Sequence, residues 1–75
     1  MSKIPRISGE AAIKAFAQVG FREVRIHGSH HILKRDGTAA NISIPVRRGK
    51  TVGIGLLKSQ IDAAGMTVED FIKLL

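Results

Sequence analysis

Apolar residues along this chain change from helical spacing to strict alternation and back, and the change predicts the order of its elements. Ser8 is a good helix N-cap, and the apolar residues that follow recur at helical spacing, which predicts a first helix over residues 9–19. The alternation over residues 21–27 then predicts a half-buried strand, with Val24 and Ile26 on its buried face.

The rest of the pattern predicts two more strands and two more helices. In chain order these are a tight turn at Gly28-Ser29, a strand over residues 30–35, a hairpin turn at Asp36-Gly37, a strand over residues 40–44, a basic loop over residues 46–53, a helix over residues 55–64 and a short helix that begins at Thr67. Strands in a meander with helices on one face make a two-layer α+β sandwich. A chain of 75 residues is enough for one domain, residues 1–75, with a small core.

The sheet face that the helices leave free is the expected place for chemistry. Arg25, His27 and Lys34 are candidates to line this face or its rim. A shift of one residue in strand register exchanges the two faces, so the pattern leaves open whether His30 or His31 faces outward.

The charge of the chain gives information about its binding partner rather than about its fold. Twelve Lys and Arg residues against six Asp and Glu residues give a formal net charge of +6. This balance favours a polyanionic partner, and nucleic acid is the commonest one in a cytosol. Most of the excess lies between Arg22 and Lys50, and all three histidines lie in the same segment. The alternative is a basic surface that only keeps a small protein soluble.

Histidine within a basic segment suits RNA cleavage. Imidazole exchanges protons near neutral pH, and RNA carries its own nucleophile, the 2′-hydroxyl. An enzyme that cleaves RNA therefore needs a base, an acid and cations on the phosphate. The alternative is that each histidine only packs or bonds to the backbone. The phosphate contacts that we predict are Ser29, Lys34, Arg35, Arg47, Arg48 and Lys50.

Several other function classes find no support in the residues. The chain has no cysteine, and Glu23 and Asp36 are the only carboxylates near the histidines, so we expect no metal site and no cofactor. Ser29 lacks a third residue to orient a base, which argues against serine-type catalysis. No apolar run is long enough for a membrane helix, and the first six residues do not look like a signal peptide, so we expect a cytoplasmic protein without membrane contact.

Six short runs stand in order along nearly the whole chain and resemble one family. They are Gly20-Phe21, Gly28-Ser29-His30-His31, Ile44-Pro45-Val46, Gly55-Leu56-Leu57, Ala64-Gly65-Met66-Thr67 and Phe71, and the N-terminal run Ile4-Pro5-Arg6-Ile7-Ser8-Gly9 is similar to the longer members. The resemblance is to the HicA toxins, the YcfA-like mRNA interferases. It implies a fold like a double-stranded-RNA-binding domain: helix, three-stranded antiparallel sheet, helix, here with a short C-terminal helix.

The resemblance also implies a function. HicA toxins are metal-independent endoribonucleases of type II toxin–antitoxin systems, which act on mRNA in stress responses and are inhibited by a HicB antitoxin. The catalytic histidine of the family follows Gly-Ser directly, which corresponds to His30 here. Many members carry a second histidine two residues after the strand-ending proline, where this chain has Arg47. If that histidine helps catalysis in relatives, arginine must serve here as a phosphate clamp, or the enzyme is weaker.

Two alternative hypotheses compete with the endoribonuclease hypothesis. A non-catalytic RNA-binding module of the double-stranded-RNA-binding type would use the same fold through shape and phosphate contacts. A purely structural partner of an acidic protein would bind that protein and show no RNA affinity at low salt.

Overall fold

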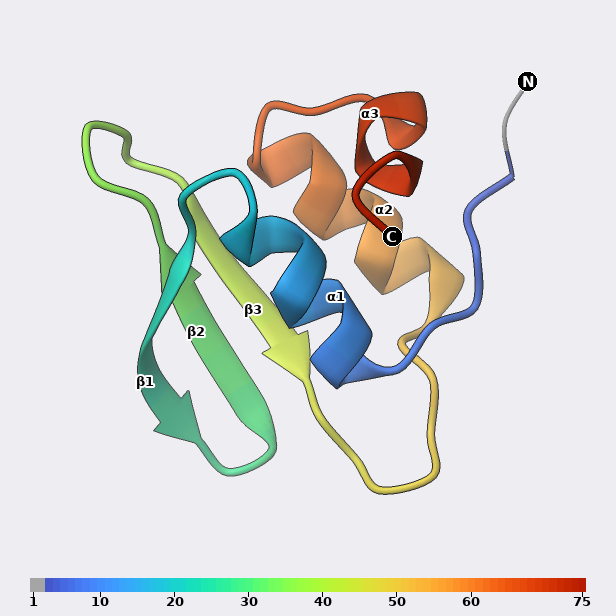
Figure 1. Ribbon diagram of the computed structural model, residues 1–75. Coiled ribbons are helices and arrows are strands. Elements are labelled where there is room, and N and C mark those ends of the chain that lie inside the picture. Colours follow the sequence, from blue (N-terminus) through green and yellow to red (C-terminus); the bar gives the residue numbers. More distant parts are fainter. Residues whose placement is uncertain (1–2) are drawn as a thin grey trace.

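The computed structural model describes residues 3–75, in which one helix is followed by three strands and then by two helices, as the periodicity predicts (Figure 1). The elements are α1 (Gly9–Ala17), β1 (Arg22–His27), β2 (His30–Lys34), β3 (Asn41–Pro45), α2 (Ile54–Ala63) and α3 (Val68–Ile72). The predicted α+β class and its element order are confirmed. The hairpin between β2 and β3 is also confirmed, although its connection spans residues 35–40 rather than a two-residue turn.

Polar side chains and glycines set the ends of the helices. The Ser8 hydroxyl accepts a hydrogen bond from the Ala11 N–H at 3.1 Å and caps α1. The chain then leaves α1 through Gly20, whose φ of +95° lies in the left-handed region that glycine adopts without strain. Thr67 caps α3 in the same way, by accepting from the Asp70 N–H at 3.1 Å.

The sheet is antiparallel throughout, in the order β1-β2-β3, and its core lies on one face. Figure 1 shows α1 and α2 on the same side of the sheet, and both contact β3. The helix-side core is made of fully buried residues from both layers: Ala12, Ala15, Phe16, Leu33, Ile42, Ile44, Val52, Leu57, Ile61 and Phe71. The two-layer arrangement therefore leaves the other face, which we call the open face, uncovered by helix.

The register assigns each strand residue to a face, because directly paired residues share one. On the open face, His30 lies opposite both His27 and Pro45, and Ile32 lies opposite both Arg25 and Ser43. The second set of paired residues, which shares the helix side, consists of Glu23, Ile26, His31, Leu33, Ile42 and Ile44. The expectation that Arg25, His27 and Lys34 line the free face is confirmed.

The prediction that β1 is half-buried is wrong. Val24 and Ile26 are 45% and 57% exposed, and every residue of β1 is exposed. The physical reason is position, because α1 and α2 lie over β3, whereas β1 lies at the far edge of the sheet (Figure 1). A bulge between Glu23 and Arg25 also interrupts the regular pairing of this edge strand. Phe21, just before β1, supplies the buried side chain instead and is only 3% exposed.

Within residues 3–75, no helix has both the length and the apolar character that crossing a bilayer requires.

Candidate functional site

A tight glycine turn places His30 at the start of β2. The turn consists of Gly28 and Ser29, and Gly28 has a φ of +64°, a conformation in which a side chain would be strained. His27 and His30 flank the turn as directly opposite residues of β1 and β2. The His30 side chain is exposed on the open face, so a substrate on that face can reach its imidazole.

A serine on the neighbouring strand lies against His30. The Ser43 Oγ is 3.4 Å from the His30 Nδ1, at the long end of hydrogen-bond distance. The Ser43 N–H donates to the Gln60 Oε1 of α2 at 2.8 Å, which ties this point of β3 to the helix layer. Ser43 was missed in the sequence analysis. The only signal was that Ser43 is a polar residue in an alternating strand, and without the register between β2 and β3 this does not show that it lies against His30.

His31 belongs to a different environment from His30. Its Nδ1 lies 2.5 Å from the Glu23 Oε1, and its side chain is only 20% exposed. Paired with Ile44 and Ile26, it is on the helix side of the sheet. The structure therefore decides the question that the strand pattern left open: His30 faces outward and His31 does not.

The basic loop after β3 lies beside the glycine turn. The Val46 N–H donates to the Ser29 carbonyl oxygen at 2.8 Å, which joins the two segments. In Figure 1 the turn between β1 and β2 and the loop after β3 lie at the same, lower end of the molecule.

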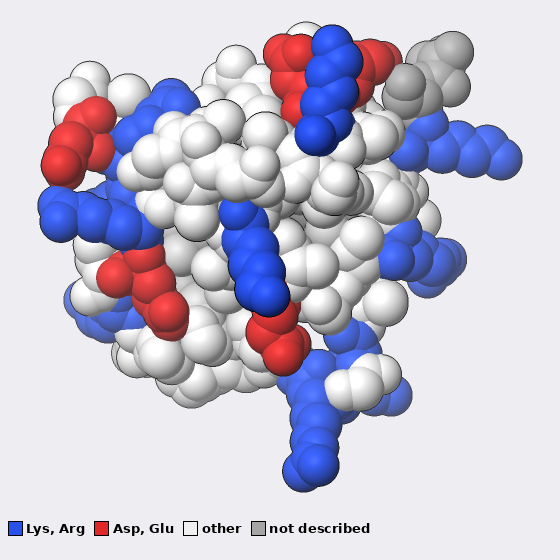
Figure 2. Space-filling view, in the orientation of Figure 1, with Lys and Arg blue, Asp and Glu red and all other residues white. Residues whose placement is uncertain are grey.

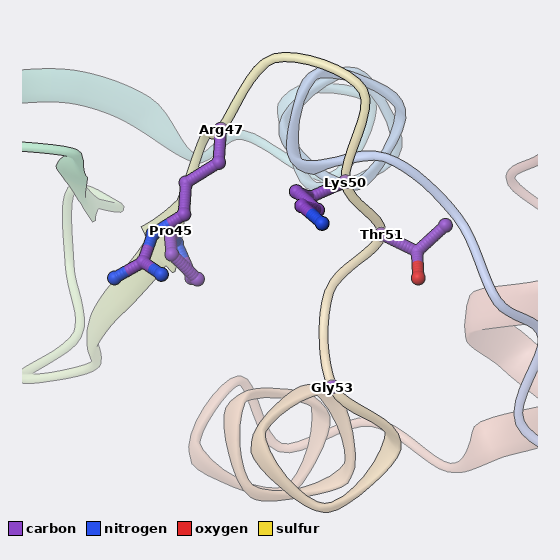
Figure 3. Close-up of a pocket in the computed structure, with 5 residues that line it drawn as sticks. All are labelled: Pro45, Arg47, Lys50, Thr51 and Gly53. Atoms are coloured by element: carbon purple, nitrogen blue, oxygen red, sulfur yellow. The ribbon is translucent and has the colours of Figure 1, made fainter.

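The basic loop after β3 lines a small pocket (Figure 3). The pocket has a volume of about 360 Å³ and is lined by Pro45, Arg47, Lys50, Thr51 and Gly53. Figure 3 shows the Arg47 side chain running back along the strand toward Pro45. Pro45, which lines the pocket, is also the residue of β3 directly opposite His30.

The other predicted contacts are less close. Arg48 is exposed in the same loop but does not line the pocket, and basic side chains project from this end of the molecule in Figure 2. Lys34 is on the open face at the opposite end of β2, about 13 Å from His30 along the strand. Arg35 lies beyond that end, with its guanidinium carbon 4.7 Å from the centroid of the Phe21 ring and its Nη1 donating to the Val19 carbonyl at 3.3 Å.

The structure thus brings together Ser29, His30, Arg47, Arg48 and Lys50, and it places Lys34 and Arg35 elsewhere. Across residues 3–75, no three His, Asp or Glu side chains gather closely enough to hold a metal ion. The arrangement can transfer a proton at His30 and hold an anion beside it.

Comparison with known protein families gives a match over most of the chain. A protein-family model described as "HicA toxin of bacterial toxin-antitoxin" matches residues 9–66, which run from the start of α1 to just beyond α2 and include the whole sheet. No curated protein matches the chain.

Proposed function

This chain belongs to the HicA toxin family of bacterial toxin–antitoxin systems, and from that membership we propose that it is a metal-independent endoribonuclease that cleaves mRNA. The observation that carries the proposal is the exposed His30 on the open face, beside a pocket lined by Arg47 and Lys50. We propose further that residues 1–75 act as a single domain in the cytoplasm and need no cofactor.

His30 is the catalytic acid–base group in this proposal. In RNA cleavage the 2′-hydroxyl attacks the neighbouring phosphorus, so a base must take its proton and an acid must protonate the leaving 5′-oxygen. His30 performs one of these transfers. A positioned acid or base of this kind contributes about 10²–10⁴-fold to the rate.

In this proposal the phosphate is held at the end of the sheet where the glycine turn and the basic loop after β3 lie. Arg47 and Lys50 supply positive charge at the pocket; Arg48 is in the same loop, and Ser29 is in the turn that accepts a hydrogen bond from the Val46 N–H. Such cations position the backbone without reading base sequence, because they contact phosphate. Lys34 supplies a further positive charge on the open face, at the opposite end of β2. Arg35 remains a predicted RNA contact, although its guanidinium already packs on Phe21.

Ser43 is a positioning residue in this proposal. Its hydroxyl lies by the Nδ1 of His30, so it would hold the ring and leave Nε2 free for proton transfer. Because Gln60 holds the backbone of Ser43, the orientation of His30 is linked to α2.

The partner that restrains the toxin is proposed to be a HicB antitoxin. A net charge of +6 favours an acidic surface on that partner.

The test compares two adjacent histidines on opposite faces. Purified His30→Ala and His31→Ala variants are incubated with RNA in the presence of a chelator, and thermal melting confirms that both are folded. We expect His30→Ala to lose about 10²–10⁴-fold in rate and His31→Ala to retain most of its activity. Unchanged cleavage by His30→Ala would refute the assignment. Wild-type protein that binds RNA but leaves it intact would favour the non-catalytic RNA-binding module.

A further inference from the structure

We infer that His27 is the second acid–base group of the same site and works as a pair with His30. This inference rests on the proposed endoribonuclease function and adds a catalytic residue to it. The observation that carries it is the strand register, in which His27 and His30 are directly opposite residues that share the open face.

The hairpin holds the two histidines in a fixed relation. His27 ends β1, His30 begins β2, and only Gly28 and Ser29 separate them. Directly opposite residues of an antiparallel pair have Cβ atoms about 4.5–5.5 Å apart. Both side chains are exposed, so the two rings can stand on either side of one phosphate group. Because the turn has only two residues, the distance between the backbones of His27 and His30 can vary little.

The chemistry needs two proton-transfer groups. One imidazole takes the proton from the 2′-hydroxyl, and the 2′-oxygen then forms its bond to phosphorus. The bond from phosphorus to the 5′-oxygen breaks, and the second imidazole, in its protonated form, gives its proton to that leaving oxygen. The products are a 2′,3′-cyclic phosphate and a 5′-hydroxyl, and the two histidines have exchanged protonation states. No water, metal or other reactant is required in this step.

The surroundings of the pair fit an anionic substrate. Arg25 precedes His27 by two residues on the same face of β1, and Pro45 beside His30 leads to the pocket of Arg47 and Lys50. The pair therefore lies between cations from two segments.

Within the three strands, the open face offers no carboxylate and no further imidazole for the second role. The open-face residues of the three strands include no carboxylate, and the one carboxylate of the strands, Glu23, is paired with His31 on the helix side. Lys34, at the far end of β2, is about 13 Å from His30 along the strand. Among the strand residues, His27 is thus the one imidazole other than His30 on the open face.

The experiment measures single-turnover cleavage of a short RNA by the full chain and by His27→Gln, His30→Gln and His31→Gln variants. Glutamine keeps a polar side chain but cannot transfer the proton. We expect His27→Gln to lower the rate constant about 100-fold or more, with the affinity for a non-cleavable 2′-deoxy analogue within about twofold of wild type. The matched control, His31→Gln, has an imidazole in the same hairpin but on the other face.

A second substrate separates the roles of the two histidines. It carries sulfur in place of the bridging 5′-oxygen at the cleavage site, and a thiolate leaves without protonation. The acid variant should recover most of its lost rate on this substrate, and the base variant should not. The inference therefore requires that one of His27→Gln and His30→Gln is rescued and the other is not.

Three results would overturn the inference. The first is cleavage by His27→Gln at the wild-type rate while His30→Gln is inactive, which would leave the proposed function intact. The second is a loss of rate in His27→Gln explained by an equal loss of affinity for the 2′-deoxy analogue. The third is rescue of neither variant, or of both, by the sulfur substrate. Absence of cleavage by the wild-type chain would instead remove the proposed function itself.

Discussion

A buried glycine at the start of α1 offers the sharpest test of how the helix layer supports the site. Gly9 is the first residue of α1 and packs directly against the end of β3. A Cβ atom at this position would overlap the Pro45 carbonyl oxygen and would lie 2.9 Å from the Val46 Cγ2. Because the first of these atoms belongs to the backbone, a side-chain rotation cannot relieve the overlap. Gly9→Ala must therefore move α1 away from the end of β3.

The expected cost follows from this geometry. Adding atoms to a well-packed position costs about 1–3 kcal/mol, and replacing glycine by alanine within a helix returns up to about 1 kcal/mol. Because the overlap is with a backbone atom, the cost lies toward the upper end of its range, and we expect Gly9→Ala to lower the free energy of unfolding by about 1–2 kcal/mol. For a chain of this length, that corresponds to a fall in Tm of roughly 6–12 °C.

The assay is thermal unfolding followed by circular dichroism, with Gly55→Ala as the matched control. Gly55 is in the first turn of α2, and a Cβ atom there would meet nothing within 4 Å. We expect this control to leave the Tm unchanged or to raise it slightly. Cleavage by Gly9→Ala should also be slower at temperatures where it is fully folded, because Pro45 lies between His30 and the basic pocket. A Tm for Gly9→Ala equal to that of the wild type would refute the packing argument.

Three further predictions test single contacts. Ser43→Ala should lower the rate constant of RNA cleavage several-fold and change the tautomer of the His30 ring, which ¹⁵N NMR detects. Ser43→Thr, which keeps the hydroxyl, should restore both, and equal rates for the two variants would contradict the positioning role. Arg47→Ala should weaken RNA binding at every sequence tested and reduce the slope of log affinity against log salt by about 1, and an unchanged slope would exclude a phosphate contact. Ile26→Thr should change the free energy of unfolding by less than about 0.5 kcal/mol in a denaturant titration, because the side chain is 57% exposed, whereas Ile42→Thr, fully buried, should cost about 2 kcal/mol or more.

Local signals in the chain predicted most of the fold. The change from helical spacing to alternation located every helix and strand, and the element order follows from it. Ser8 and Thr67 marked two helix starts, because their hydroxyls accept hydrogen bonds from N–H groups a few residues away. These interactions are close in sequence, so a pattern of residues is enough to reveal them.

Which strand residues are buried depends on contacts between distant segments, and a local sequence pattern does not show these contacts. Alternation placed Val24 and Ile26 on a buried face, yet both are exposed because the helices lie over β3 and not over β1. The choice of which strands a helix covers is made by packing between distant segments. Arg35 is a second example. It was predicted as an RNA contact, but its guanidinium packs on the Phe21 ring, a contact between residues far apart in the chain.

For the candidate site, the sequence by itself determined the chemistry that is available: a glycine turn followed by histidine, a basic loop, and no cysteine. Only the tertiary structure decided how these groups meet. Strand register put His30 on the open face and His31 on the other, set Ser43 beside His30, and aligned His27 across from it. The reason is that a shift of one residue in register reverses every side chain of a strand, and register is fixed by pairing and core packing together.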